Sequence, residues 1–505
     1  MFWNEVFLIL KRNKPDIANL DEAIRFLDKS ELPEGKDNAK ASLMAKGIIS
    51  DEVYNELKKN HENVLKELPN DLSPATYKKN TRGVVFIGGG RFSWLAYLSL
   101  KYLRATGSEL PVEIIMPTFK DYEQELDFCH NMLPTLGASC VVVPDVFGSE
   151  VMLNWSFQNY QFKALALMIS SFQHTLLLDS DNLILQNPDK IFDSEVYKNY
   201  GMITWPDYWV RRITPKFYDI AGVKVNEKKR VRYNIYPLEV SDSSSLNEEE
   251  MKDVPYHDLE GTIPDLSTES GQIFINKATH GKTLLLSLYY NLYGPKLFYR
   301  LFSMGDQGEG DKDTFPAAAI VTKQKYYQVK SMIKTFGYFN AEHRFEGVAL
   351  GQKDPLADYD YFTNKLFPSI TKQNKNADLK TQIANIERII AEPSEERNGI
   401  QVFTLHCNYP KFDLLDLMNK PDIYDKEKNH LKYDFYGDFS FKRSVIKDGE
   451  KTTIDVHFEQ DMWKEIKTTL CDRNIKFAHY AKADMKEVCK FAEKQLEWIT
   501  STLKS

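Results

Sequence analysis

The segment "YQFKALALMISSFQHTLLLDSDN", residues 160–182, joins a helical pattern to an apolar strand that ends in acidic residues. Residues 175–178 favour a buried strand, and Asp179 and Asp181 follow at once with only Ser180 between them. Two carboxylates this close repel each other and need water or a cation. Ligands of open α/β sheets bind beyond the carboxyl ends of the strands, so this D-x-D predicts either a metal site or a solvated strand end. The pattern by itself leaves both readings open.

Strand and helix patterns alternate along most of the chain. Further short apolar strands are expected where the sequence reads "GVVFIGGG" (from residue 83), "PVEIIMPT" (111), "SCVVVPD" (139), "GMITWPD" (201), "GQIFINK" (271) and "IQVFTLHCNYPKFD" (400). Such alternation indicates a parallel, doubly wound sheet with helices on both faces. We therefore predict the α/β fold class.

The chain also divides into regions by pattern. Its 505 residues exceed the size at which a single core stops growing, so several domains or one large elaborated domain are expected. Residues 1–80 read as a helical, charged N-terminal extension, residues 81–420 carry the strand–helix alternation, and residues 421–505 read as a C-terminal helical cap.

A glycine turn follows the first of these strands. Gly88, Gly89 and Gly90 stand between a strand and a helix, as in a dinucleotide-binding turn. The pattern is not G-x-G-x-x-G, because Phe92 and Ser93 occupy the positions where it would continue. A tight structural turn and a nucleotide contact are equally compatible with these residues, while an NAD-dependent enzyme would need the missing motif.

Composition excludes several classes of function. A net charge of −7 and a pI near 5.9 argue against a nucleic-acid-binding protein. No stretch approaches the roughly 20 apolar residues of a membrane-spanning helix, and the start, "FWNEVFLILKR", does not read as a signal peptide. We therefore expect a cytosolic protein or the soluble part of a longer one.

The cysteines and a glycosylation sequon give two further indications. None of the five cysteines forms C-x-x-C, which argues against a zinc site. The sequon at Asn154 fits a secretory protein but is common by chance.

Several segments in one order carry a family resemblance over about residues 80–500. The segment at 160–182 resembles the donor site of metal-dependent nucleotide-sugar glycosyltransferases with a GT-A fold. The series is completed by "GMITWPDYWVRRITPKFYDIAG", "STESGQIFINK", "KTLLLSLYYNLYGPKLFY", "GEGDKDTFPAAA" and "LHCNYPKFD". It resembles the fungal Golgi α-mannosyltransferases of N-glycan mannan synthesis. Within them it is most similar to the α-1,2 branch that adds the first side-branch mannose to the α-1,6 backbone.

The resemblance implies a fold, a reaction and a compartment. It implies a GT-A-type, Rossmann-like catalytic domain over residues 81–420, GDP-mannose as donor, Mn²⁺ (with Mg²⁺ as an alternative) as cofactor, and an α-mannan or N-glycan acceptor. It implies residence in the Golgi lumen, with a type II membrane anchor that this chain lacks. An α-1,3-mannosyltransferase of the sibling branch and a catalytically inactive glycan-binding protein of the same fold remain the alternatives.

The resemblance also assigns residues to the donor and the metal. The implied donor contacts are Gly88, Gly89, Lys163, Asp179, Ser180, Asp181 and Lys411. The implied metal ligands are Asp179, Asp181 and His406. On their own, Lys163 would be taken for a helix lysine that reaches out to solvent and His406 for a core histidine.

The acceptor and the chemistry are assigned in the same way. The aromatic and acidic "WPDYW" suggests acceptor contacts from Trp205, Asp207, Tyr208 and Trp209, although a buried aromatic cluster explains Trp205 equally well. The implied catalytic residues are Asp311, Asp313, Glu269 and Gln272, with Asp311 the first choice. Composition alone would make "GEGDKD" a solvated turn. In an oxidising lumen the expected disulfides are Cys129–Cys140 and Cys471–Cys489, which leaves Cys407 unpaired.

Overall fold

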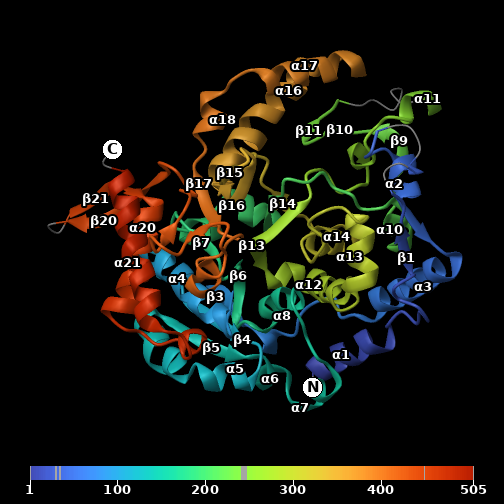
Figure 1. The fold of residues 1–505 in the computed structure, drawn as a ribbon. Coiled ribbons are helices and arrows are strands. Elements are labelled where there is room, and N and C mark those ends of the chain that lie inside the picture. Colours follow the sequence, from blue (N-terminus) through green and yellow to red (C-terminus); the bar gives the residue numbers. More distant parts are fainter. Residues whose placement is uncertain (1, 29–30, 33–35, 240–246, 448–449, 504–505) are drawn as a thin grey trace.

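A seven-stranded sheet forms the centre of the computed structural model, which describes all residues except 1, 29–30, 33–35, 240–246, 448–449 and 504–505 (Figure 1). Its strands, in spatial order, are β14 (Tyr327–Gln328), β8 (Met202–Pro206), β13 (Thr268–Asn276), β6 (Phe172–Leu178), β3 (Lys78–Ile87), β4 (Val112–Met116) and β5 (Ala138–Val142). The predicted α/β class with a Rossmann-like sheet is confirmed.

Side-chain alternation along the strands creates two cores. Leu176 and Leu178 of β6 belong to one apolar cluster, and Leu177 belongs to the other, because successive side chains of a strand point to opposite faces. Helix α4 (Arg91–Ala105) packs in the first cluster, and helices α8 (Gln161–Ile169) and α12 (Lys277–Leu292) pack in the second. Both faces of the sheet are therefore covered, which explains why its strands read as continuous apolar runs.

One strand departs from the predicted parallel sheet. Strand β13 runs antiparallel to both of its neighbours, β6 and β8. The reason lies in the connection from β8 to β13, in which Thr268 pairs with Pro206. The chain leaves the sheet at the last residue of β8 and re-enters it beside that residue, so β13 runs in the opposite direction to β8. This places Glu269 and Ser270, the second and third residues of β13, at the end of the sheet where the parallel strands finish.

A second sheet of four strands adjoins the first. It contains β15 (Lys334–Phe339), β16 (Phe345–Lys353), β17 (Val402–His406) and β7 (Asn182–Ile184) in that order. Strand β7 starts immediately after the D-x-D, so the two aspartates join the last residue of β6 in one sheet to the first residue of β7 in the other. Strands β7 and β17 are antiparallel, with His406 opposite Asn182.

Segments at both chain ends pack against this body. In the N-terminal part, α1 (Phe2–Arg12) and α3 (Asp51–Glu67) contribute apolar side chains to the same cluster as α8 and α12. In the C-terminal part, α20 (Phe458–Lys467) and α21 (Met485–Thr502) belong to the cluster of α4, beyond the hairpin of β20 (Ser440–Lys447) and β21 (Glu450–His457). The proposed boundaries at residues 80 and 420 stay predictions.

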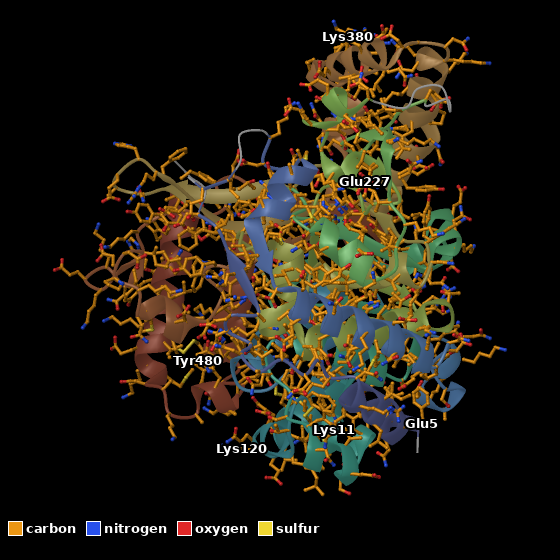
Figure 2. All side chains as sticks on the ribbon, turned by 90° about the vertical axis from the view of Figure 1, so that its right-hand side faces the viewer. Glu5, Lys11, Lys120, Glu227, Lys380 and Tyr480 are labelled. Carbon is orange, nitrogen blue, oxygen red and sulfur yellow. A yellow bond between two sulfur atoms is a disulfide. The ribbon has the colours of Figure 1, made fainter. Side chains whose placement is uncertain are left out.

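A third, smaller cluster supports a projecting helical layer. It joins Tyr236 and Leu238 to the segment that includes α16 (Phe367–Asn374) and α17 (Leu379–Ala391). Lys380 marks the top of this projection in Figure 2, at the opposite end of the molecule from Lys11 of α1. Within the part of the chain that the structure describes, no helix is long and apolar enough to cross a membrane.

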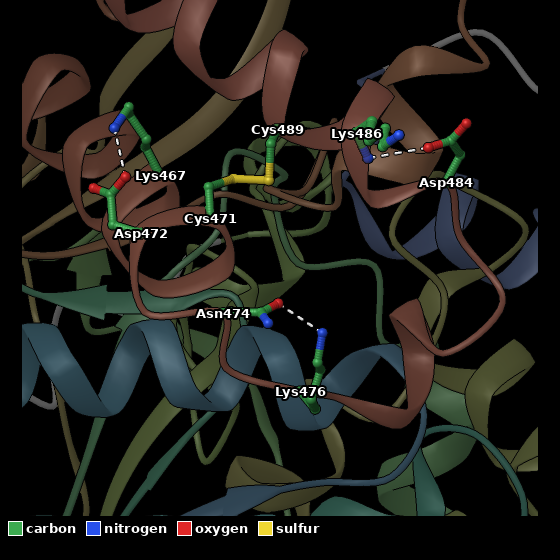
Figure 3. Close-up of a disulfide and its surroundings, with 8 residues drawn as sticks. All are labelled: Lys467, Cys471, Asp472, Asn474, Lys476, Asp484, Lys486 and Cys489. Atoms are coloured by element: carbon green, nitrogen blue, oxygen red, sulfur yellow. Dashed lines mark hydrogen bonds and ion pairs between the residues drawn. A yellow bond between two sulfur atoms is a disulfide. The ribbon is translucent and has the colours of Figure 1, made fainter.

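Two disulfides join the expected cysteines. Cys129 is bonded to Cys140, a residue of strand β5. Cys471, just after α20, is bonded to Cys489 of α21, and Figure 3 shows this bond between the two C-terminal helices. Cys407 is free and buried.

Candidate active site and metal centre

Three potential metal ligands meet where β6, β7 and β17 come together. His406 Nε2 lies 3.3 Å from an Asp181 oxygen and 3.7 Å from an Asp179 oxygen. One ligand atom from each of the three residues can be chosen so that all lie within 4.8 Å of one another. The pairing of His406 with Asn182 creates this arrangement, because it sets the histidine beside the aspartate that precedes β7. An Asp-Asp-His group able to hold a cation is thus present.

The surroundings of the histidine suit it to this role. Glu269 Oε1 lies 3.0 Å from His406 Nδ1, so Nε2 is the nitrogen that faces the aspartates. A carboxylate behind a histidine ligand is a common means of orienting the ring toward a metal. Burial lowers the pKa of His406, but the carboxylates of Asp181 and Glu269 outweigh it and raise that pKa to about 10. Two carboxylates and an imidazole fit a hard or borderline divalent cation, which would take the place of the Nε2 proton.

Two lysines compensate the charge of the aspartates. Lys163 Nζ, from α8, lies 2.9 Å from Asp179, and Lys411 forms an ion pair with Asp181. Burial raises the pKa of Asp179 above its ordinary range; for Asp181 burial acts in the same direction, but His406 and Lys411 outweigh it and lower the pKa. Both aspartates therefore belong to a charge network with two lysines and a histidine, and Asp181 is buried in it instead of standing at a solvated strand end.

Lys163 also connects the aspartates to Asp311. Its ammonium group lies 3.7 Å from Asp311 Oδ2 and donates to Ser270 Oγ at 3.0 Å. The Ser270 hydroxyl in turn donates to Asp311 at 3.1 Å. Burial raises the pKa of Asp311 to about 6. The segment "GEGDKD" is not a fully solvated turn, since Asp311 and Asp313 are both buried.

Two cavities meet at this network. One cavity, of about 840 Å³, is lined by residues that include Gly88, Gly89, Ser180 and Asp181; we call it the donor-side cavity because the family resemblance assigns these residues to the donor. A second cavity, of about 540 Å³, is lined by residues that include Asp207, Glu269 and Asp311; we call it the acceptor-side cavity because the resemblance assigns Asp207 to the acceptor. Both cavities share four residues: Tyr160, Lys163, Asp179 and Lys411. The Asp179–Asp181–His406 group therefore lies where the two cavities meet.

The glycine turn belongs to the donor-side cavity. Gly89 and Gly90 have φ of +92° and +54°, a region that side chains disfavour, and an added Cβ at Gly88 would lie 2.7 Å from Ile114. The tight turn is thus a structural requirement, and the same backbone lines the cavity. Ser180 is held beside it by a hydrogen bond from its hydroxyl to the Ile87 carbonyl oxygen.

The "WPDYW" segment is divided between cavity and core. Asp207, Tyr208 and Trp209 line the acceptor-side cavity, and Asp207 pairs with Lys312 at 2.6 Å. Trp205 does not face the cavity. Its side chain is 0% exposed, and its indole N–H donates to the Lys353 carbonyl oxygen at 2.8 Å. Strand alternation turns it toward the apolar core instead of the site.

Two expected catalytic residues hold other groups in place instead of lining either cavity. Gln272 is buried and donates to Glu269 Oε2 at 2.9 Å, so it supports Glu269 from behind. Asp313 accepts from the buried Arg211 at 2.5 Å and from the Thr268 backbone N–H at 3.0 Å. Both side chains follow cavity residues closely in sequence, but the local backbone turns them inward.

The structure adds side chains to the site that the sequence reading did not select. Tyr160 and Tyr409 line the acceptor-side cavity and are 50% and 65% exposed. Lys312 also lines it and pairs with Asp207. The available signal was position, because Tyr160 begins the helix of Lys163 and Tyr409 stands between His406 and Lys411. Exposed aromatic faces beside charged groups are suited to binding sugars.

Comparison with known proteins identifies the family of the chain. Residues 81–354 match the family described as "Mannosyltransferase putative", a stretch that contains Asp179, Asp181, Glu269 and Asp311. The chain belongs to this mannosyltransferase family. An α-1,2-mannosyltransferase of Candida albicans, MNN23, is 49% identical over 99% of this chain and 84% of its own length. The α-1,2-mannosyltransferase MNN2 of Saccharomyces cerevisiae is 37% identical over 82% of this chain and 72% of its own.

Solved structures resemble this family member only distantly. Mouse xyloside xylosyltransferase 1 is 14% identical with a TM-score of 0.28, over 49% of this chain and 85% of its own. The glycosyltransferase GlyE of Streptococcus pneumoniae is 12% identical with a TM-score of 0.28, over 50% of this chain and 45% of its own. The matched family region ends before His406, so the third potential ligand lies outside it.

Proposed function

We propose that this protein is a retaining α-1,2-mannosyltransferase that transfers mannose from GDP-mannose to the α-1,6-linked mannan backbone of N-glycans. The observation that carries the proposal is the Asp179–Asp181–His406 group at the opening between two cavities. Family membership and the α-1,2-mannosyltransferase activity named for the relatives support the sugar and the linkage.

The donor-side cavity is assigned to GDP-mannose. Gly88 and Gly89 offer close backbone approach, and Lys411 and Lys163 supply positive charge at the opening where a diphosphate would lie. Asp179, Asp181 and His406 would hold Mn²⁺, with Mg²⁺ as the alternative, and the ion would neutralise the charge that develops on the diphosphate. Glu269 orients the His406 ring for this purpose.

Asp311 is assigned to the mannose. Its carboxylate lines the acceptor-side cavity, and Ser270 and Lys163 hold it in position. A buried carboxylate there can bind sugar hydroxyls or face the positive charge that develops at the anomeric carbon. Lys163 close to Asp179 and Asp311 keeps these two carboxylates near each other despite their repulsion.

Retention of configuration leaves two routes. In the front-face route the bond to the phosphate oxygen breaks as the acceptor oxygen attacks from the same side, and the departing phosphate oxygen takes the acceptor proton. In the double-displacement route the carboxylate of Asp311 or Glu269 displaces the diphosphate and forms a covalent bond to the anomeric carbon; the acceptor oxygen then displaces that carboxylate as it loses its proton. Asp313 is unsuited to that role because Arg211 and Thr268 engage its carboxylate. We favour the front-face route, which needs no strong base.

The proposed compartment is the one that the family resemblance implies. We propose the Golgi lumen, with a type II membrane anchor in the full-length protein. Two disulfides fit an oxidising compartment.

The test is direct product analysis. The protein, GDP-mannose, Mn²⁺ and a reducing-end-labelled α-1,6-mannooligosaccharide should yield an acceptor with one more hexose, and NMR should show an α-1,2 linkage. The control is Asp181→Asn, which keeps the shape of the side chain but removes its charge. An α-1,3 product would assign the sibling activity. Acceptor binding without any transfer would instead identify a glycan-binding protein.

A further inference from the structure

A third cavity continues the acceptor-side cavity toward the N-terminal segment. This outer cavity, about 510 Å³, is lined by residues that include Phe26, Lys46, Arg212 and Asp306. It shares five lining residues with the acceptor-side cavity: Trp209, Gly308, Glu309, Gly310 and Lys312. The three cavities are thus adjacent in series: the Asp179–Asp181–His406 group lies between the first two, and residues between 26 and 46 line the far side of the third.

The outer cavity and the acceptor-side cavity meet at Trp209 and residues 308–310. Trp209 is 42% exposed, and these four residues line both cavities. Gly308 has a φ of +78°, and a Cβ there would lie 3.1 Å from Trp209 Cδ1 and 2.6 Å from Lys312 Nζ. A side chain at this position would therefore press against the tryptophan ring and the Lys312 ammonium group. Glycine keeps the ring available to a ligand that runs from one cavity into the next.

The outer cavity carries both signs of charge. Asp306 pairs with Lys46 and with Arg212, the latter at 2.9 Å, and thereby joins α2 (Lys40–Lys46) to the loop after Ser303. Glu309 is exposed and accepts a hydrogen bond from the Ser303 hydroxyl at 2.7 Å. Such alternating donors and acceptors beside aromatic surface suit a neutral polyhydroxylated ligand. An anionic ligand would face the carboxylates of Asp306 and Glu309.

We propose that the outer cavity binds sugar units of the acceptor beyond the unit that is glycosylated, so that the enzyme selects longer acceptors. The proposal rests on the transferase function proposed above, and it specifies that the protein contacts several sugar units of the acceptor. Trp209 stacks on the chain between the two cavities, and Lys46 and Asp306 bind hydroxyls at the far end. Acceptor length is thus sensed by the N-terminal segment, which lies outside the matched family region.

The experiment compares acceptor lengths. Initial rates with α-1,6-linked mannobiose and mannohexaose give kcat/KM for each acceptor at saturating GDP-mannose. The ratio for hexaose over biose should be about tenfold or more in the unmodified protein, the size expected from one or two further hydrogen bonds to charged groups. Lys46→Ala should lower that ratio to within about threefold of one.

Two further variants keep the result interpretable. Gln307→Trp adds bulk at an exposed residue that lines only the outer cavity, so it should lower the ratio without disturbing the core. Lys58→Ala is the matched control, because Lys58 also belongs to the N-terminal segment and pairs with an aspartate, Asp219, at 3.1 Å, away from the cavity. It should leave the ratio at the unmodified value.

The outcomes separate the two proposals. Transfer to both acceptors with a ratio near one in the unmodified protein, or an unchanged ratio in both Lys46→Ala and Gln307→Trp, would overturn the outer subsite alone. Absence of transfer to either acceptor would overturn the proposed function itself. Should Lys46→Ala fail to fold, as judged by its unfolding temperature, the Gln307→Trp ratio decides.

Discussion

His406 Nδ1 lies 3.0 Å from Glu269 Oε1, while its Nε2 faces Asp181 at 3.3 Å. One ring therefore joins the start of β13 to the aspartates between β6 and β7. The glutamate, placed at this edge because β13 runs antiparallel, determines which nitrogen is free to face a cation. The geometry of the Asp179–Asp181–His406 group thus depends on a residue outside it.

Removing His406 should weaken metal binding. For His406→Ala we expect the Mn²⁺ dissociation constant, measured by calorimetry in the presence of GDP, to rise at least tenfold. Glu269→Gln should give an increase of about 10- to 100-fold, the usual effect of losing a group that orients a metal ligand. His343→Ala, at an exposed histidine, is the control. Unchanged Mn²⁺ affinity in His406→Ala would remove this residue from the ligand set.

Asp311 should act on the transition state. We expect Asp311→Asn to lower kcat by about 100-fold or more while the GDP dissociation constant stays near normal, the pattern of an interaction made only during the reaction. Wild-type kcat in this variant would exclude Asp311 from the chemistry. Mass spectrometry of the enzyme after rapid quenching tests the route, since a mannosyl adduct on Asp311 or Glu269 would contradict front-face attack.

Asp313, two residues later, should behave differently. Asp313→Asn leaves the buried Arg211 guanidinium without its carboxylate, so we expect a loss of about 3–5 kcal/mol in the free energy of unfolding. Urea denaturation measures this loss, and Asp311→Asn provides the comparison. A stable Asp313→Asn protein with a selective loss of kcat would instead restore Asp313 to the reaction.

The two tryptophans of "WPDYW" should also differ. Trp205→Ala empties a fully buried site and should cost about 3–5 kcal/mol of stability. Trp209→Ala removes a half-exposed ring and should leave the unfolding temperature nearly unchanged while it raises the acceptor KM. Thermal unfolding and acceptor kinetics on both variants check this. A destabilised Trp209→Ala protein with normal KM would show that its ring serves packing.

Stability should fall in mild acid because of His61. Burial lowers the pKa of this histidine to about 4 from an ordinary 6.5, and its Nε2 lies 2.7 Å from the Tyr290 hydroxyl. In the unfolded chain His61 therefore becomes protonated below pH 6.5, whereas in the folded chain it stays neutral until about pH 4. The contribution of neutral His61 to the free energy of unfolding is fully present above pH 6.5, and about 2 kcal/mol of that free energy should be lost by pH 5.

The measurement is urea denaturation at pH 7 and pH 5. His61→Gln, which cannot titrate but can still bond to Tyr290, should lose about 2 kcal/mol less between these values than the unmodified protein. Equal losses in the two proteins would show that His61 is protonated in the folded state or that other groups account for the acid sensitivity.

Much of the site could be predicted from local sequence. The apolar run before Asp179 required a buried strand, and in an α/β sheet the residues that follow such a strand lie at the binding edge. The motif series added Lys163, His406, Lys411 and Asp311, which the structure brings together around the two cavities. These features depend on strand ends and motif order, which a linear sequence retains.

Other features depended on which strands pair. The direction of β13 follows from its antiparallel pairing with β8. The approach of His406 to Asp181 follows from the pairing of β17 with β7. Neither pairing can be predicted from either segment alone. The backbone N–H and C=O groups that form the hydrogen bonds are alike along every strand, so they do not specify the partner strand. The inward positions of Trp205, Gln272 and Asp313, and the N-terminal wall of the outer cavity, were likewise decided only by long-range packing of the chain.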